Sequence, residues 1–110
     1  MTFGRTQKES ISLAMAEYPL SKSAEKDLKI IAEYTIEQFG IEQARNYKES
    51  LVAAFEFLAR HPVVGLDFSH LGKGWRRHPY QDHCIYYKEV SSGILILRLI
   101  HSRQDPALHL

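Results

Sequence analysis

Histidine and arginine side chains recur in the last third of the chain, at spacings that could serve phosphate chemistry. Metal-independent cleavage of an RNA strand needs a base for the 2′-hydroxyl proton, an acid for the leaving oxygen and cations around the phosphate. The candidates for this chemistry are His101, Arg98, Arg76 and Arg77, with His78 and Arg103 close by. Alternation along a strand sends Arg98 and His101 to opposite faces unless a bulge intervenes, and it separates Arg76 from Arg77. The residue types are present, but their spacing does not bring them into one pocket.

The other reactive side chains favour structural roles. The six histidines show neither HExxH nor paired CxxC spacing, and no glycine-rich phosphate loop occurs. Cys84 adjoins His83 in a predicted strand, where neighbours point to opposite faces, so a buried thiol is expected rather than a Cys–His dyad. We therefore expect no metal and no cofactor.

Length and composition predict one globular domain with a single core. The chain has 110 residues, 45% of them hydrophobic, and a net charge of +1, which argues against strong or sequence-specific binding of nucleic acid. Residues 72–103 nevertheless hold six Lys and Arg against two Asp and Glu, a basic surface suited to an acidic partner. A single cysteine and no apolar run near the roughly 20 residues of a membrane span predict a cytoplasmic protein without a membrane partner.

The first half of the chain predicts a helical hairpin. Residues 1–14 show no clean period and are expected to be a flexible extension of a single domain that spans 15–110. Residues 16–20 alternate like a short strand at a sheet edge, because Pro19 cannot donate to a ladder. The elements that follow are a helix over about 22–39, capped by Ser21 and ended by Gly40, and a second helix that ends before Pro62.

The second half predicts a loop over 63–74 and three antiparallel strands, at 75–80, 83–90 and 94–101. The last strand is apolar on both faces, which suits a central position under the helices. We expect Arg98 within it to be paired with Asp67 or Asp105, because an unpaired buried charge is costly. Asp105 is also expected to cap a terminal helical turn that starts at Pro106. The fold class is α+β, a helix hairpin packed on an antiparallel sheet.

This order of elements, with several strings in it, resembles the RelE/ParE superfamily of bacterial type II toxin–antitoxin modules. The strings are YPLSKSAEKDLKIIAEYTIEQFG, ARNYKESLVAAFEFLARHPVVG, WRRHPYQDHCIYYKE and ILRLIHSRQDP, and the last is similar to the end of ParE-type members in particular. The resemblance covers residues 16–110 and depends on the concatenation of the strings.

The resemblance implies a toxin that a cognate antitoxin neutralises by folding a disordered segment along the toxin's groove. ParE-type relatives poison DNA gyrase and RelE-type relatives cleave messenger RNA on the ribosome. A gyrase-binding inhibitor without chemistry of its own is the favoured interpretation. The alternatives are a ribosome-dependent endoribonuclease and an inactivated relative that only binds its antitoxin.

Two sets of contact residues are predicted. The target-binding set is Arg98, His101, Arg103 and Asp105, where the last strand leaves the core. The antitoxin-binding set is Tyr18, Leu28, Tyr34, Phe55 and Trp75. An acidic and hydrophobic antitoxin segment is expected to pack on the helices and to pair with the sheet edge near Tyr18.

Overall fold

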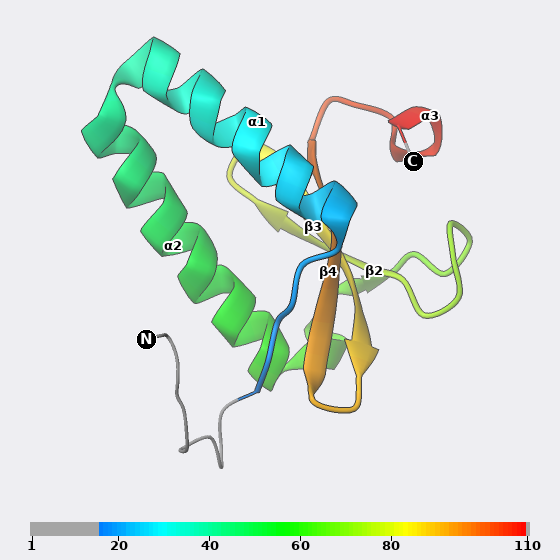
Figure 1. Ribbon diagram of the computed structural model, residues 1–110. Helices are drawn as coiled ribbons and strands as arrows, with labels where there is room; N and C mark the ends of the chain where they lie inside the picture. Colours follow the sequence, from blue (N-terminus) through cyan, green and yellow to red (C-terminus); the bar gives the residue numbers. More distant parts are fainter. Residues whose placement is uncertain (1–15, 110) are drawn as a thin grey trace.

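The computed structural model describes residues 16–109, so the predicted extension over 1–14 lies outside the described residues (Figure 1). Two long helices lie on one side of an antiparallel sheet, as expected for the α+β fold. The elements are α1 Lys22–Phe39, α2 Ile41–Arg60, a 3-10 turn Pro62–Val64, β1 Leu66–Asp67, β2 Arg76–Tyr80, β3 His83–Val90, β4 Gly93–His101 and α3 Pro106–His109.

Capping residues set the limits of the helical hairpin. The Ser21 hydroxyl accepts a hydrogen bond from the Ala24 N–H at 3.0 Å, which satisfies a free amide of the first turn of α1. Gly40 is the sole residue between α1 and α2, and its φ of 93° and ψ of 166° suit a residue without Cβ. The predicted cap and the predicted reversal are both confirmed.

The sheet is four-stranded, in the order β1-β2-β3-β4, and every pairing is antiparallel. The predicted three-stranded meander is confirmed as β2, β3 and β4. The sheet has one further strand, β1, which comes from the segment expected to be a loop. The described part of the N-terminal segment lies along the free edge of β4, as predicted, and forms two isolated parallel bridges there, Glu17 with Gly93 and Leu20 with Ile96. The expected regular strand is not formed between these bridges, since Pro19 has no N–H with which to extend the pairing.

A β-bulge interrupts the pairing of β3 with β4. Tyr86 lies opposite Arg98, whereas the next residue, Tyr87, lies opposite Ile96, so Leu97 is the extra residue. A bulge shifts the alternation of the strand by one residue. Before it Ile96 faces the helices, and after it Leu99 and His101 do so. The strict alternation that would separate Arg98 from His101 therefore does not hold.

The two faces of the sheet carry separate hydrophobic clusters. The larger lies under the helices and joins the base of the hairpin to β3 and β4; its fully buried side chains include Leu51, Phe55 and Leu58. The smaller lies on the opposite face, where Phe68, Leu71 and Trp75 cover Cys84, Tyr86 and Ile100. Cys84 is buried, as predicted.

The Gly40 end of the hairpin extends away from the sheet (Figure 1). Five large apolar residues of this end are between 44% and 66% exposed, namely Ile30, Tyr34, Ile36, Phe39 and Ile41, whereas Ile31 packs against the core. We call residues 30–41 the apical end. The apolar residues of the apical end recur at the same helical spacing as those of the buried base, but the sheet does not cover the apical end.

A candidate binding groove at the end of the last strand

A groove of about 640 Å³ lies between the hairpin and the C-terminal end of β4. The helices contribute an apolar wall that includes Ile30, Tyr34 and Phe39 from the apical end. The sheet contributes a polar wall, formed by side chains of β3, β4 and the turn after it: His83, Arg98, His101 and Gln104. An apolar wall opposite a few convergent polar groups is the usual composition of a binding site.

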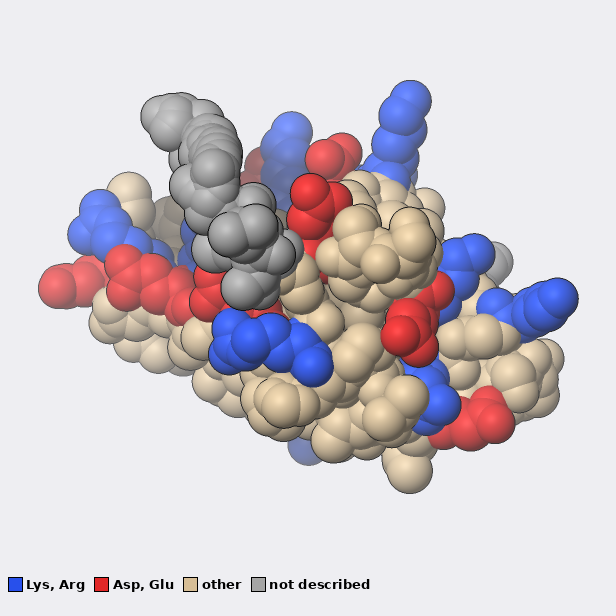
Figure 2. Space-filling model, turned by 90° about the horizontal axis from the view of Figure 1, so that it is seen from below, with Lys and Arg blue, Asp and Glu red and all other residues tan. Residues whose placement is uncertain are grey.

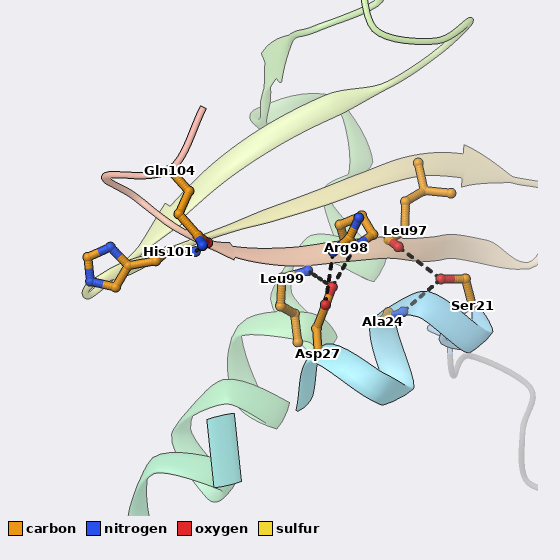
Figure 3. Close-up of polar contacts among 8 residues, drawn as sticks. All are labelled: Ser21, Ala24, Asp27, Leu97, Arg98, Leu99, His101 and Gln104. Atoms are coloured by element: carbon orange, nitrogen blue, oxygen red, sulfur yellow. Dashed lines mark hydrogen bonds and ion pairs between the residues drawn. The ribbon is translucent and has the colours of Figure 1, made fainter. Parts of the chain in front are cut away.

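Arg98 is anchored in this groove by Asp27 of α1 (Figure 3). Its Nε donates to Asp27 Oδ2 at 2.7 Å and its Nη2 donates to Asp27 Oδ1 at 3.0 Å. This hydrogen bonding raises the pKa of Arg98 above its ordinary value. An ion pair for Arg98 was predicted, but the predicted partners, Asp67 and Asp105, are wrong.

The two aspartates expected to pair with Arg98 serve local turns. Asp67 Oδ1 accepts from the Ser69 N–H at 2.8 Å. Hydrogen bonding with the side chain of Ser69, followed by this backbone bond, lowers the pKa of Asp67. Asp105 Oδ1 accepts from the Ala107 N–H at 3.0 Å, which confirms its role as the cap of α3.

Two histidines and a tyrosine form the polar end of the groove. His83 and His101 are partners in the β3–β4 register, and their ring centroids lie 5.4 Å apart. Tyr47 Oη lies 3.1 Å from His83 Nδ1. Burial, followed by the neighbouring His101, lowers the pKa of His83, while burial raises the pKa of Tyr47 to about 12. Both groups are therefore uncharged at neutral pH.

The chain after β4 folds into a hydrogen-bonded turn. His101 Nδ1 accepts from the Arg103 N–H at 3.1 Å, and the His101 N–H donates to Gln104 Oε1 at 3.2 Å. The side chains of Arg103 and Gln104 are exposed. Of the four predicted target-binding residues, Arg98 and His101 line the groove, and Arg103 lies at its rim in the turn between His101 and Gln104. Asp105 does not line the groove; it is near Tyr86 on the opposite face of the sheet and contributes to the raised pKa of that residue, which is due mainly to burial.

Arg76 and Arg77 lie elsewhere. Arg76 donates to the carbonyls of Val63 and Gly65, at 3.3 and 2.8 Å. Arg77 points to the other face of the sheet, where its guanidinium carbon lies 4.8 Å from the centroid of the Phe68 ring. The four candidates for ribonuclease chemistry are therefore divided among three places.

The predicted antitoxin-binding residues are also divided. Tyr34 lines the groove and is 59% exposed, and Leu28 lines a second, apolar cavity of about 470 Å³ on the outer side of the hairpin. Tyr18 is partly buried against Phe55, their ring centroids 5.9 Å apart. Phe55 is only 1% exposed and belongs to the core, which corrects its expected place on the surface. Trp75 packs against Tyr86 on the opposite face of the sheet.

Asp27 is one of the groove residues that were not predicted from the sequence, together with Tyr47, His83 and Gln104. It lies on the apolar stripe of α1, three residues after Ala24 and four before Ile31. A carboxylate on a helix stripe that faces a strand containing one arginine is the signal that could have revealed the pair.

The surface offers few other kinds of site. Lys and Arg are interspersed with Asp and Glu over the face seen in Figure 2, rather than gathered in one basic area. Among residues 16–109, no three His, Cys, Asp or Glu side chains are grouped so as to hold a metal ion. Nor does the described part of the chain contain a helix with the length and apolarity needed to cross a membrane.

The comparisons with known proteins agree with this architecture. Residues 18–106 match the family model of the ParE toxin of the type II toxin–antitoxin system parDE. Toxin ParE1 of Caulobacter vibrioides is 34% identical over 87% of this chain and 99% of its own length, and Toxin ParE1 of Mycobacterium tuberculosis is 28% identical over 82% and 93%. A chain of the chromosomal ParDE system from P. aeruginosa has the same fold, with a TM-score of 0.66, 19% identity and coverage of 79% and 96%.

The family match, together with the fold, places the chain among the small α+β toxins of type II toxin–antitoxin systems. The chain belongs to the ParE toxin family. Membership implies an antitoxin as its partner, as the name of the system states.

Proposed function

We propose that this toxin acts by binding DNA gyrase and inhibiting it, and that its cognate antitoxin prevents this by occupying the groove. The observation that carries the proposal is that residues of the predicted target-binding set and of the predicted antitoxin-binding set line the same groove. Arg98 and His101 come from the predicted target-binding set, and Tyr34 comes from the predicted antitoxin-binding set. One occupant of the groove would exclude the other.

The surface chemistry supports a protein partner. The apical end offers aromatic and aliphatic side chains beside a small number of polar groups, the composition typical of protein-binding hot spots. The exposed Arg103 at the rim adds a cation for an acidic partner. We place the protein in the cytoplasm, where gyrase is found.

The antitoxin contact has two parts. An amphipathic segment packs its apolar side on the apical end, and an extended part pairs with the N-terminal segment. The carbonyl oxygens of Glu17 and Pro19 face β4, where they accept hydrogen bonds from the backbone N–H groups of Ile94 and Ile96, at 2.9 Å each. Alternation then directs the backbone groups of Tyr18 to the outer side, where an added strand can meet them.

Ribonuclease activity has less support. Arg98 and His101 share the groove, but Arg98 is bound to Asp27, and Arg76 and Arg77 lie in other places. A phosphate in the groove would thus lack some of the acid, base and cationic groups that metal-independent RNA cleavage requires. An inactivated relative would share every feature of the fold and would differ only in being harmless.

The test is a gyrase supercoiling assay run beside RNA cleavage on translating ribosomes, with toxin freed from its antitoxin. We expect loss of supercoiling with intact RNA. Arg103→Ala should weaken inhibition by about 2 kcal/mol, roughly thirtyfold, whereas Lys73→Ala should leave it unchanged. Each variant removes one cation from an exposed position, and Lys73 lies in the loop that covers the opposite face.

Cleaved RNA with unaffected gyrase would replace the proposal by the endoribonuclease alternative. A chain that does neither, and whose expression without antitoxin is harmless, would indicate the inactivated relative. Equal losses in Arg103→Ala and Lys73→Ala would indicate a general effect of charge rather than a contact at the groove.

A further inference from the structure

The bulge in β4 is held from outside the sheet by the side chains of Ser21, the N-cap of α1, and of Asp27 within α1 (Figure 3). Ser21 Oγ donates to the Leu97 carbonyl at 2.9 Å, and Asp27 Oδ2 accepts from the Leu99 N–H at 3.0 Å. Helix α1 therefore supplies hydrogen bonds on both sides of the strand's most irregular part. A bulge disrupts the ladder locally, so backbone groups beside it depend on such partners.

Asp27 makes the stronger of these two attachments. Both of its carboxylate oxygens are occupied, since Arg98 donates to each and Leu99 donates to one. The side chains of Asp27 and Arg98 are only 13% and 21% exposed. A two-pronged contact between guanidinium and carboxylate fixes orientation as well as distance, so it ties one turn of α1 to two consecutive residues of β4.

The position of His101 depends on this attachment. With the bulge, Leu99 and His101 face the helices, and His101 meets His83 at the groove. Uninterrupted alternation would turn Ile100 toward the groove and His101 away from it. The turn through Arg103 and Gln104, which is hydrogen-bonded to His101, would move with it.

We infer that Asp27 is a positioning residue for target binding, because its bonds to Arg98 and Leu99 hold the bulge that presents His101 and the following turn at the groove. The inference rests on the proposed function only where it names the groove as the target site. The structural part, control of the bulge by a helix side chain, stands on the contacts of Asp27 alone.

The structural part is tested by NMR on Asp27→Asn, with Glu49→Gln as the control. Both variants neutralise one carboxylate of the hairpin, but Glu49 lies on α2, is exposed and lines neither cavity. We expect the Leu99 amide of Asp27→Asn to exchange at least about tenfold faster, and the ring contact between His83 and His101 to weaken. The Phe55 amide, in the buried part of α2 and away from the bulge, should report any general loss of stability.

The functional part uses the same variants in the supercoiling assay, at a temperature at which each is folded. Asp27→Asn should inhibit gyrase about tenfold less well, Asp27→Glu should recover part of the loss, and Glu49→Gln should match the wild type. Recovery by a carboxylate of different length separates positioning from simple destabilisation. If Asp27→Asn does not fold, Asp27→Glu carries the test, with smaller changes in the same direction.

The outcomes are distinguishable. Unchanged Leu99 exchange and an intact His83–His101 contact in Asp27→Asn would overturn the inference. So would loss of Leu99 protection that is matched by equal loss at Phe55. If the wild type does not inhibit gyrase, the proposed function fails, while the NMR result still decides whether Asp27 holds the bulge.

Discussion

The two ends of the helical hairpin have the same apolar pattern but different surroundings. The base lies on the sheet, and its side chains Leu51, Phe55 and Leu58 are at most 1% exposed. The apical end carries residues of the same kind, and Phe39 remains 66% exposed. Helical periodicity therefore shows which side of a helix is apolar but not what covers it. Because toxins of this family are paired with an antitoxin, the uncovered end is where we expect the antitoxin to bind.

The largest difference between the two ends should appear in stability. Phe55→Ala leaves a cavity in the core and should lower the free energy of unfolding by about 3–5 kcal/mol. Phe39→Ala removes an exposed ring and should change it by less than about 0.5 kcal/mol. Urea denaturation of the two variants measures both values. Similar losses would mean that the apical end is packed more tightly than its exposure indicates.

The order should reverse for binding of the antitoxin. Phe39→Ala should weaken the complex by about 2 kcal/mol, because aromatic side chains on such surfaces contribute disproportionately. Calorimetric titration with the purified antitoxin measures this change. The exposed Val63, at the far end of α2, provides the control, since Val63→Ala also truncates an exposed apolar side chain. An equal effect of both variants would argue against a specific apical contact.

A smaller effect is expected at the turn that joins the ends. Gly40 has a backbone conformation that other residues adopt at a cost, although a Cβ there would meet no neighbouring atom. Gly40→Ala should therefore lower the free energy of unfolding by about 1–2 kcal/mol through backbone strain alone. Gln38→Ala, at an exposed helical position two residues earlier, should be neutral in the same urea experiment. A neutral Gly40→Ala would show that the turn relaxes freely.

The smallest effect concerns pH and the polar end of the groove. Because the folded-state pKa of His83 is lowered, the unfolded chain binds more protons than the folded one between the two pKa values. Stability should thus be complete above about pH 6.5, the ordinary histidine value, and should fall as the pH drops below it. His83→Gln should flatten this fall in part, and the remainder should come from His78, whose pKa burial also lowers. A fall that is unaltered by His83→Gln and His78→Gln together would assign it to other groups.

Local signals explain why the sequence predicted the elements well. The Ser21 cap, the Gly40 reversal, Pro62 and the short turns between strands each act over a few residues, so they can be recognised without the fold. The bulge at Leu97 cannot, because its hydrogen bonds come from Ser21 and Asp27, 76 and 72 residues away from their partners. The error about the partner of Arg98 has the same origin, since the true pair is separated by 71 residues.

The site was predictable only in outline for a related reason. His101 and Arg98 were recognised as candidates by type, but strict alternation placed them on opposite faces, and one extra residue reversed that result. Phe55 and Tyr34 share the apolar character of the hairpin, and only the extent of the sheet places one in the core and the other at the groove.

The most direct test of the partner surface is hydrogen exchange, measured on the toxin alone and bound to its cognate antitoxin. We expect new protection at residues 30–41 and 98–104, which form the two walls of the groove, with little change in the loop that covers the opposite face. Protection confined to that loop around Phe68 and Trp75, with the apical end still exchanging freely, would contradict the assignment of the groove as the binding site.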